Sequence, residues 1–272
     1  CNCICIIGFP NLFPIVVVKM SISKLGMLIH LFSISGICLT AIRLQCMANP
    51  EIGPVSTFSI VARDPESGAI GIAVASKYLA VGSAVPWAKA QVGAIATQSY
   101  VNTTLGSAAL ALLAQGKPAK ETIDEVLEKD PGKELRQVGI VDSKGNSFAF
   151  TGKNCMPWAG SKKSDNLCIQ GNLLTGPEVI DAMFNSFEKQ RGELSVRLIT
   201  ALAAGEKAGG DKRGKQSAAI LVVRANRGPN GLGDRELDLR VDDHPDPNVE
   251  LSRLLEIHKR FYPSLHRSRP TR

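Results

Sequence analysis

The feature of the sequence that most constrains the fold is an alternation of strand pairs with helix pairs. Residues 56–63, STFSIVAR, and 69–76, AIGIAVAS, are apolar and partly alternating runs that flank DPESG, a stretch with Asp at the turn entry and Gly at its exit. This unit predicts a β-hairpin, and QVGAIATQ at 91–98 predicts a third strand. Because consecutive parallel strands need a crossover connection, hairpins favour antiparallel sheets.

Helical periodicity begins after the third strand. Segments 103–116 and 118–132 predict two consecutive helices, and Pro118 opens the second. In the rest of the body, the pattern predicts a hairpin at 136–152, a strand at 167–172 and helices at 176–190 and 193–209. It then predicts strands at 217–225 and 235–243 and a terminal helix at 247–262. This order predicts an α+β fold of antiparallel sheets covered by helices, for which a four-layer αββα sandwich is one solution. A two-layer fold with a single sheet satisfies the same periodicity.

The charge of the chain lies mainly at its ends. The 272 residues carry 32 basic and 25 acidic side chains, but the first 46 residues and those after Glu256 contain basic residues and no acidic ones. The body between them is therefore nearly neutral, and aromatic residues make up only 5% of the chain. Nucleic-acid-binding domains combine a basic face with stacking aromatics, so no nucleic-acid partner is predicted.

The first 48 residues are typical of an export leader. From Met20 the sequence has a short cationic start, an uncharged apolar run at 25–42 and a small-residue site that ends at Ala48. We therefore predict a leader at 1–48, a linker at 49–56, a domain at 57–262 and a basic tail at 263–272. The product would be periplasmic or secreted, without stable membrane insertion after leader cleavage. A retained membrane anchor is the alternative, since the apolar run is at the lower limit for spanning a bilayer.

Five of the seven cysteines lie in the leader, which leaves Cys155 and Cys168 in the body. An even pair in an oxidising compartment predicts a disulfide. Two buried free thiols are the alternative, because no histidines stand beside these cysteines to complete a metal site. The stretch DDHPDP at 242–247 predicts a turn and a helix cap, so neither a metal nor another cofactor is expected.

Several stretches resemble one protein family. In chain order they are TFSIVARDPESGAIGIAVASKYLAVGSAVPWAKAQVGAIATQS, CMPWAG, QGNLLTG, GDKRGKQSAAILVV and LRVDDHPDPNVELSRLLEIH. Together they resemble the family catalogued as domain of unknown function 1028, over residues 57–258. The resemblance implies an N-terminal-nucleophile (Ntn) hydrolase-like fold, an αββα sandwich in which Thr, Ser or Cys at the chain start attacks amide bonds.

The resemblance also implies a catalytic threonine. Thr57 would be the nucleophile, and its own α-amine, with a pKa near 8, would be the base. A nearby cation would lower the pKa of that amine. Lys89 stands at a spacing from Thr57 similar to that of the catalytic lysine in proteasome-type relatives, and Lys77 is a second candidate. Solvated surface lysines are the alternative for both. Leader cleavage after Ala48 would still leave eight residues, NPEIGPVS, in front of Thr57.

Polar residues at strand ends are candidates for binding the substrate. An oxyanion needs hydrogen-bond donors, and the strand-end amides that can supply them are Gln98, Asn102, Gln170 and Asn172. The glycine-rich loop GDKRGKQS offers Arg213, Gln216 and Ser217 for a substrate carboxylate. We therefore predict an exported amidohydrolase acting on a small amide or peptide, and a homo-oligomer is left open. The alternative is a catalytically silent ligand-binding or envelope-associated domain on the same fold.

Overall fold

A computed structural model describes residues 3–7, 16–20 and 57–266, in two units. In the first unit, β1 (Cys3–Ile7) and β2 (Val16–Met20) form an antiparallel pair. The apolar run at 25–42, the predicted cleavage site and linker, and residues 267–272 lie outside the described residues, so the export leader stays a prediction. Within the described ranges, no helix is long and apolar enough to cross a membrane.

The second unit contains a six-stranded sheet in the order β12-β11-β4-β3-β10-β9. All neighbouring strands in it are antiparallel. Its strands are β3 (Thr57–Arg63), β4 (Ile70–Ser76), β9 (Gly160–Ser164), β10 (Leu167–Asn172), β11 (Ser217–Val223) and β12 (Arg235–Val241). The predicted hairpin is confirmed as β3–β4, which pairs Thr57 with Ser76 and Arg63 with Ile70.

A second, four-stranded antiparallel sheet has the order β5-β6-β7-β8. Its strands are β5 (Pro86–Lys89), β6 (Gly93–Ser99), β7 (Arg136–Asp142) and β8 (Ser147–Thr151). Strands β5 and β9 were not predicted from the sequence. The first is short and opens with proline. The second, GSKKS, is an edge strand that carries two lysines and has no apolar face.

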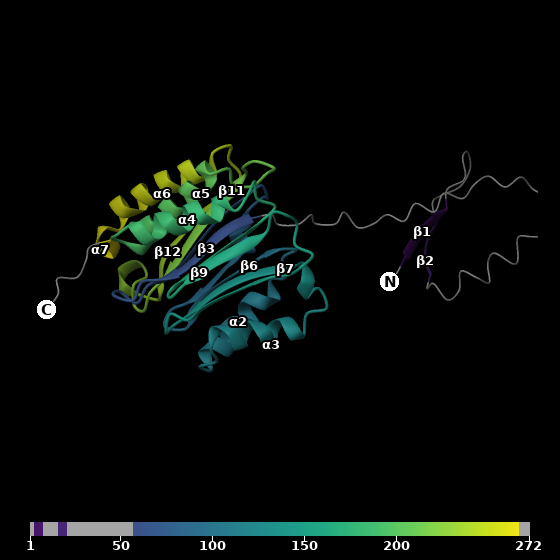
Figure 1. Ribbon diagram of the computed structural model, residues 1–272, viewed down its shortest axis with the longest axis horizontal. Coiled ribbons are helices and arrows are strands. Elements are labelled where there is room, and N and C mark those ends of the chain that lie inside the picture. Colours follow the sequence, from purple (N-terminus) through teal and green to yellow (C-terminus); the bar gives the residue numbers. More distant parts are fainter. Residues whose placement is uncertain (1–2, 8–15, 21–56, 267–272) are drawn as a thin grey trace, which may run out of the picture. The chain divides into compact units, whose positions relative to one another are not determined.

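Helices cover the outer face of each sheet (Figure 1). On the six-stranded sheet, α4, α5 and α6 bury Met183, Leu198 and Leu251 against Ile60 and Ile220. On the four-stranded sheet, α2 and α3 pack against its apolar face in a separate core cluster. The helices are α2 (Thr104–Ala114), α3 (Ala119–Glu128), α4 (Glu178–Lys189), α5 (Leu194–Lys207), α6 (Pro247–Phe261) and α7 (Pro263–His266), with 3-10 turns at Val81–Ser83, Lys133–Leu135 and Pro229–Gly231.

The inner faces of the two sheets meet in a third apolar cluster. Val61 and Ile72 of the larger sheet lie in this cluster with Ala94 and Val141 of the smaller one. Side chains alternate along a strand, so Phe58 of β3 faces the helices while its odd-numbered neighbours face the other sheet. The predicted α+β class with antiparallel sheets is confirmed, and the single-sheet alternative is wrong, because the second unit contains two sheets.

The predicted disulfide is wrong, because Cys155 and Cys168 are both buried free thiols. Cys155 follows β8, and its Sγ lies 3.3 Å from the main-chain oxygen of Arg136. Cys168 is fixed within β10, where its Sγ lies 3.3 Å from the main-chain oxygen of Phe148. Desolvation raises the pKa of both thiols, to about 12 for Cys168. Each thiol therefore lies against a different main-chain oxygen, and the two cysteines do not pair with each other.

Candidate functional site

Thr57 opens a central strand of the larger sheet and is completely buried. In the strand register it lies opposite Ser76 of β4 on one side and Asn172 of β10 on the other. Its Oγ1 donates a hydrogen bond to Ser76 Oγ over 3.2 Å. Because β3 begins where β4 and β10 end, these three side chains lie at one end of the sheet.

The predicted amides Gln98, Gln170 and Asn172 belong to one buried network between the sheets. We call Ser59, Gln98, Gln137, Gln170 and Asn172 the amide network, and each of these residues is 0% exposed. Gln98 Nε2 donates to the main-chain oxygen of Thr57 over 3.2 Å and to Gln137 Oε1 over 2.8 Å. Ser59 Oγ in turn donates to Gln98 Oε1 over 2.6 Å. The network therefore joins the two sheets directly at Thr57.

Gln137 and Gln170 complete these cross-sheet contacts. Gln137 Nε2 donates to the main-chain oxygen of Gly171 over 2.8 Å, and Gln137 Oε1 accepts from Asn172 Nδ2 over 3.0 Å. Gln170 Nε2 donates to Ser59 Oγ over 2.5 Å. A Cβ added to Gly139 would come within 1.9 Å of Gln170 Oε1, so glycine is needed at that position to admit the amide.

The network satisfies most of the polar groups that it buries, as an interior polar cluster must. Its glutamine donors point to main-chain, hydroxyl and amide oxygens within the protein. Gln98 and Gln170 therefore hold the sheets together. To donate a hydrogen bond to a substrate, either side chain would have to give up one of its present hydrogen bonds within the protein. Asn172 differs, because its Oδ1 has no hydrogen-bond partner among the described residues.

The fourth predicted amide, Asn102, serves the start of α2. Its Oδ1 accepts hydrogen bonds from the main-chain nitrogen of Thr104 at 3.1 Å and from Thr104 Oγ1 at 2.7 Å. Its Nδ2 donates to Asp130 Oδ2 over 3.0 Å. The side chain thus fixes the entry to the helix, a common use of asparagine before a first turn. It makes no hydrogen bond with Thr57 or the amide network.

Lys89 is not brought to Thr57. It ends β5, is exposed, and lies opposite Gly93 at the start of β6, whereas Gln98 contacts Thr57 near the end of β6. Five residues of strand separate the two levels, which is roughly 17 Å along the strand. Lys77 follows Ser76 directly and is exposed, and its main-chain nitrogen donates to Asp211 Oδ2 over 3.0 Å.

The predicted carboxylate-binding loop is occupied by contacts within the protein. The Arg213 guanidinium binds the Asp211 carboxylate through Nη2 at 2.8 Å and Nε at 3.1 Å. Gln216 Nε2 donates to Asp243 Oδ1 over 3.1 Å. Ser217 lies opposite Ser76 in the register, and its Oγ accepts from the main-chain nitrogen of Val81 over 3.1 Å. Ser217 is thus the member of this loop that lies closest to Thr57 in the sheet.

Ser76 also lines a small cavity of about 80 Å³ on the helix side of the sheet end. Phe58, Asp211 and Lys215 are among its other lining residues. Within the described part of the chain, no group of three or more His, Cys, Asp or Glu side chains is arranged to hold a metal ion.

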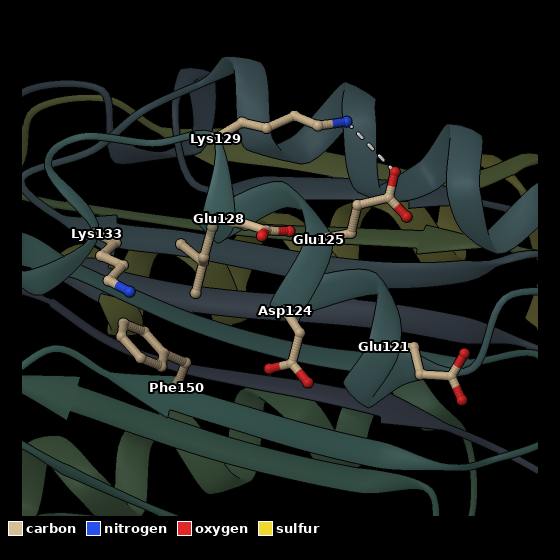
Figure 2. A pocket seen from close by; sticks show the side chains of 8 residues that line it. Glu121, Asp124, Glu125, Glu128, Lys129, Lys133 and Phe150 are labelled. Carbon is tan, nitrogen blue, oxygen red and sulfur yellow. Dashed lines mark hydrogen bonds and ion pairs between the residues drawn. The ribbon is translucent and has the colours of Figure 1, made fainter.

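A larger hollow of about 680 Å³ lies on the outer side of α3 and β8 (Figure 2). Its carboxylates line one helix, and Glu125 is held by ion pairs with Lys117 and Lys129. The lining includes Glu121, Asp124, Glu125, Glu128, Lys129, Lys133 and Phe150, none of which touches Thr57 or the amide network. This hollow is an open acidic surface and is separate from the candidate site.

One family matches most of the folded unit. The family described as "Family of unknown function (DUF1028)" matches residues 57–251. This chain belongs to the DUF1028 family. The predicted family is therefore confirmed, and the DUF1028 match begins at Thr57, the first residue of β3.

A solved DUF1028 protein resembles the chain closely. The crystal structure of protein SPO2555 from Silicibacter pomeroyi is 34% identical, covers 75% of this chain and 86% of its own, and has a TM-score of 0.69. The Anbu (ancestral beta-subunit) protein from Yersinia bercovieri is 10% identical, with a TM-score of 0.32 over 79% of this chain and 100% of its own. No curated protein matches the chain.

Three residues of the site were not predicted from the sequence: Ser59, Ser76 and Gln137. A signal for each was present. Ser59 stands two residues after Thr57 and so shares its face of the strand, and Ser76 ends the hairpin that Thr57 begins. Gln137 is a polar residue inside the apolar run RQVGIVD, where a buried amide must find partners.

Proposed function

We propose that this DUF1028 protein is an exported amidohydrolase of the N-terminal-nucleophile type, and that Thr57 is its nucleophile in molecules whose chain begins there. The proposal includes the fold, a four-layer αββα sandwich of the Ntn type. In support, two antiparallel sheets share an inner apolar cluster, and each has its own helices on the outer side.

The observation that carries the proposal is the placement of Thr57 itself. It is the first residue of a central strand and of the DUF1028 match, its hydroxyl is held 3.2 Å from Ser76 Oγ, and its carbonyl is held by Gln98. Both contacts also satisfy polar groups that are completely buried, as an interior threonine requires. Fixing the hydroxyl and the carbonyl also fixes Cα, and therefore the position at which an α-amine would stand.

The chemistry proposed for this arrangement uses one residue twice. The uncharged α-amine of Thr57 takes the proton from its own Oγ1 as that oxygen bonds to the amide carbon of the substrate. The tetrahedral intermediate then collapses, the C–N bond breaks, and the leaving amine takes up the proton. Water hydrolyses the resulting ester by the reverse sequence, which releases the acid and restores the hydroxyl. No metal or cofactor enters this sequence.

The substrate class is part of the proposal, a small amide or peptide. It follows from the nucleophile chemistry and not from the cavity beside Ser76, because Thr57 does not line that cavity. The cavity lies on the helix side of the sheet, whereas the Thr57 side chain faces the other sheet.

Processing is the second requirement of the proposal. Signal cleavage after Ala48 would leave residues 49–56 attached to Thr57, so a second cleavage before Thr57 is needed. The test compares two purified proteins, one beginning at Thr57 and one beginning at Asn49, against a panel of small amides and dipeptides, with T57A in the shorter form as the control. The proposal requires turnover by the first protein alone. Turnover by the T57A variant would reject it.

The second candidate is a catalytically silent domain that binds a small ligand. The commitment of the glutamine donors to internal hydrogen bonds and the burial of Thr57 favour it. Equal ligand binding by the two forms, with no turnover by either, would support this candidate and reject the hydrolase.

A further inference from the structure

Asn172 contains the one side-chain atom of the amide network that is left without a partner. Its Nδ2 donates to Gln137 Oε1 over 3.0 Å, but its Oδ1 is buried and accepts no hydrogen bond among the described residues. A buried polar atom without a partner costs about 1–3 kcal/mol. The amides of Gln98, Gln137 and Gln170 are paired through both their nitrogen and their oxygen, so Asn172 is an exception within an otherwise paired cluster.

The position of Asn172 relates this exception to Thr57. The two residues are directly opposite in the β3–β10 register, where the Cβ atoms of paired residues lie about 4.5–5.5 Å apart. A series of hydrogen bonds also connects them, from Asn172 Nδ2 to Gln137 Oε1, from Gln98 Nε2 to the same oxygen, and from Gln98 Nε2 to the carbonyl of Thr57. The Asn172 side chain thus lies in the inner layer that Thr57 faces.

We propose that Asn172 Oδ1 accepts a hydrogen bond from the α-amine of Thr57 in molecules whose chain begins at that residue. A peptide nitrogen has one hydrogen to donate, whereas an α-ammonium group has three. Cleavage before Thr57 therefore creates the donor that the buried acceptor lacks. In this inference, which rests on the proposed function, Asn172 is a positioning residue that holds the amine beside Oγ1.

The test is a titration of that amine, which needs no substrate. The protein beginning at Thr57 is reacted with an amine-selective reagent across pH 5–9, and peptide mapping reports the labelling rate of the Thr57 amine. The N172L variant removes the acceptor, and N172D replaces it with a carboxylate in the same shape. N248L is the matched control, since Asn248 is also buried and its Oδ1 also has no partner among the described residues, but it lies on α6 and donates to Glu206.

A hydrogen bond to the charged form raises a pKa, and a nearby carboxylate raises it further. We expect N172L to label about threefold faster than the unsubstituted protein near pH 7, which corresponds to a pKa lower by about half a pH unit. N172D should label more slowly, and N248L should match the unsubstituted protein. Circular dichroism identifies folded variants, and if N172L does not fold, N172D decides alone.

Identical labelling profiles for the folded Asn172 variants and the unsubstituted protein would overturn the inference. The result is separable from the fate of the proposed function. A shifted titration without turnover of any amide would uphold the role of Asn172 and reject hydrolysis, whereas turnover with an unshifted titration would do the reverse.

Discussion

The side chain of Gln98 donates a hydrogen bond to the main-chain carbonyl of Thr57 over 3.2 Å, and so connects one sheet to the first residue of the central strand of the other. The same nitrogen contacts Gln137, and the Gln98 oxygen accepts from Ser59. One glutamine therefore supports three groups that are completely buried. This contact makes the stability of the fold and the geometry of the candidate site depend on the same residue.

Replacing Gln98 by leucine should lower the free energy of unfolding by about 3 kcal/mol. The leucine cannot hydrogen-bond to the buried Thr57 carbonyl, Gln137 or Ser59, and these groups cannot reach water instead. Urea denaturation measures the change. The matched control is Gln216→Leu, since Gln216 is only half-buried and contacts the exposed side chain of Asp243. A loss in Q98L no larger than that in Q216L would contradict the assignment of Gln98 as a cross-sheet link.

Cys155 and Cys168 should remain reduced and unreactive in the folded protein. Burial raises the pKa of Cys168 to about 12, so almost no thiolate exists at pH 8 to react. A chromogenic disulfide reagent should label this residue only after urea is added, and the melting temperature should be the same with and without a reducing agent. Reductant-dependent melting, or a Cys155–Cys168 cross-linked peptide in the mass spectrum, would show that the disulfide forms after all.

The sequence predicted the strands and helices whose periodicity is strong, including the β3–β4 hairpin and α2 to α6. It also predicted three amides of the network, because Gln98, Gln170 and Asn172 lie within the last three residues of β6 or β10. It did not predict Gln137, whose role depends on which strand faces which across the inner layer. It also predicted Lys89 near Thr57, from the spacing along the chain. The strand β5 was not recognised, and it places Lys89 at the opposite end of β6 from Gln98.

Acid should weaken the fold through Asp130. A hydrogen bond from Arg136, assisted by Asn102 and the main-chain nitrogen of Gly132, lowers the pKa of Asp130 from 3.8 to about 2. Because the pKa is lower in the folded state, this contribution is present above pH 4 and is lost as the pH falls towards 2, by about 2 kcal/mol in all. Urea titrations of the unsubstituted protein and D130N at pH 7, 4 and 2.5 measure it.

In these titrations D130N should be less stable at pH 7 and should lose less stability on acidification. The control is D124N, because Asp124 makes an exposed pair with Lys120 on the surface of α3. Parallel acid profiles for D130N and the unsubstituted protein would refute the role given to Asp130.

Lys89 should have no influence on the reactivity of Thr57. The strand register places its level roughly 17 Å along β6 from Gln98, so K89M should leave both the pH profile and the rate of any Thr57 reaction unchanged within twofold. Gln98→Glu, which places a carboxyl group beside the Thr57 carbonyl, should change the rate by more than tenfold. A tenfold loss in K89M would mean that this lysine reaches Thr57, and that the β5–β6 pairing differs in the active protein.

The proposal that Thr57 is an N-terminal nucleophile is tested most directly by locating a covalent bond. An electrophile that modifies hydroxyl nucleophiles is added to three proteins: the one beginning at Thr57, the one beginning at Asn49, and T57A in the shorter form. Peptide mass spectrometry then identifies the modified residue. We predict modification of Thr57 Oγ1 in the first protein and none in the other two. Equal labelling of all three, or labelling of the first protein at a residue other than Thr57, would contradict the account.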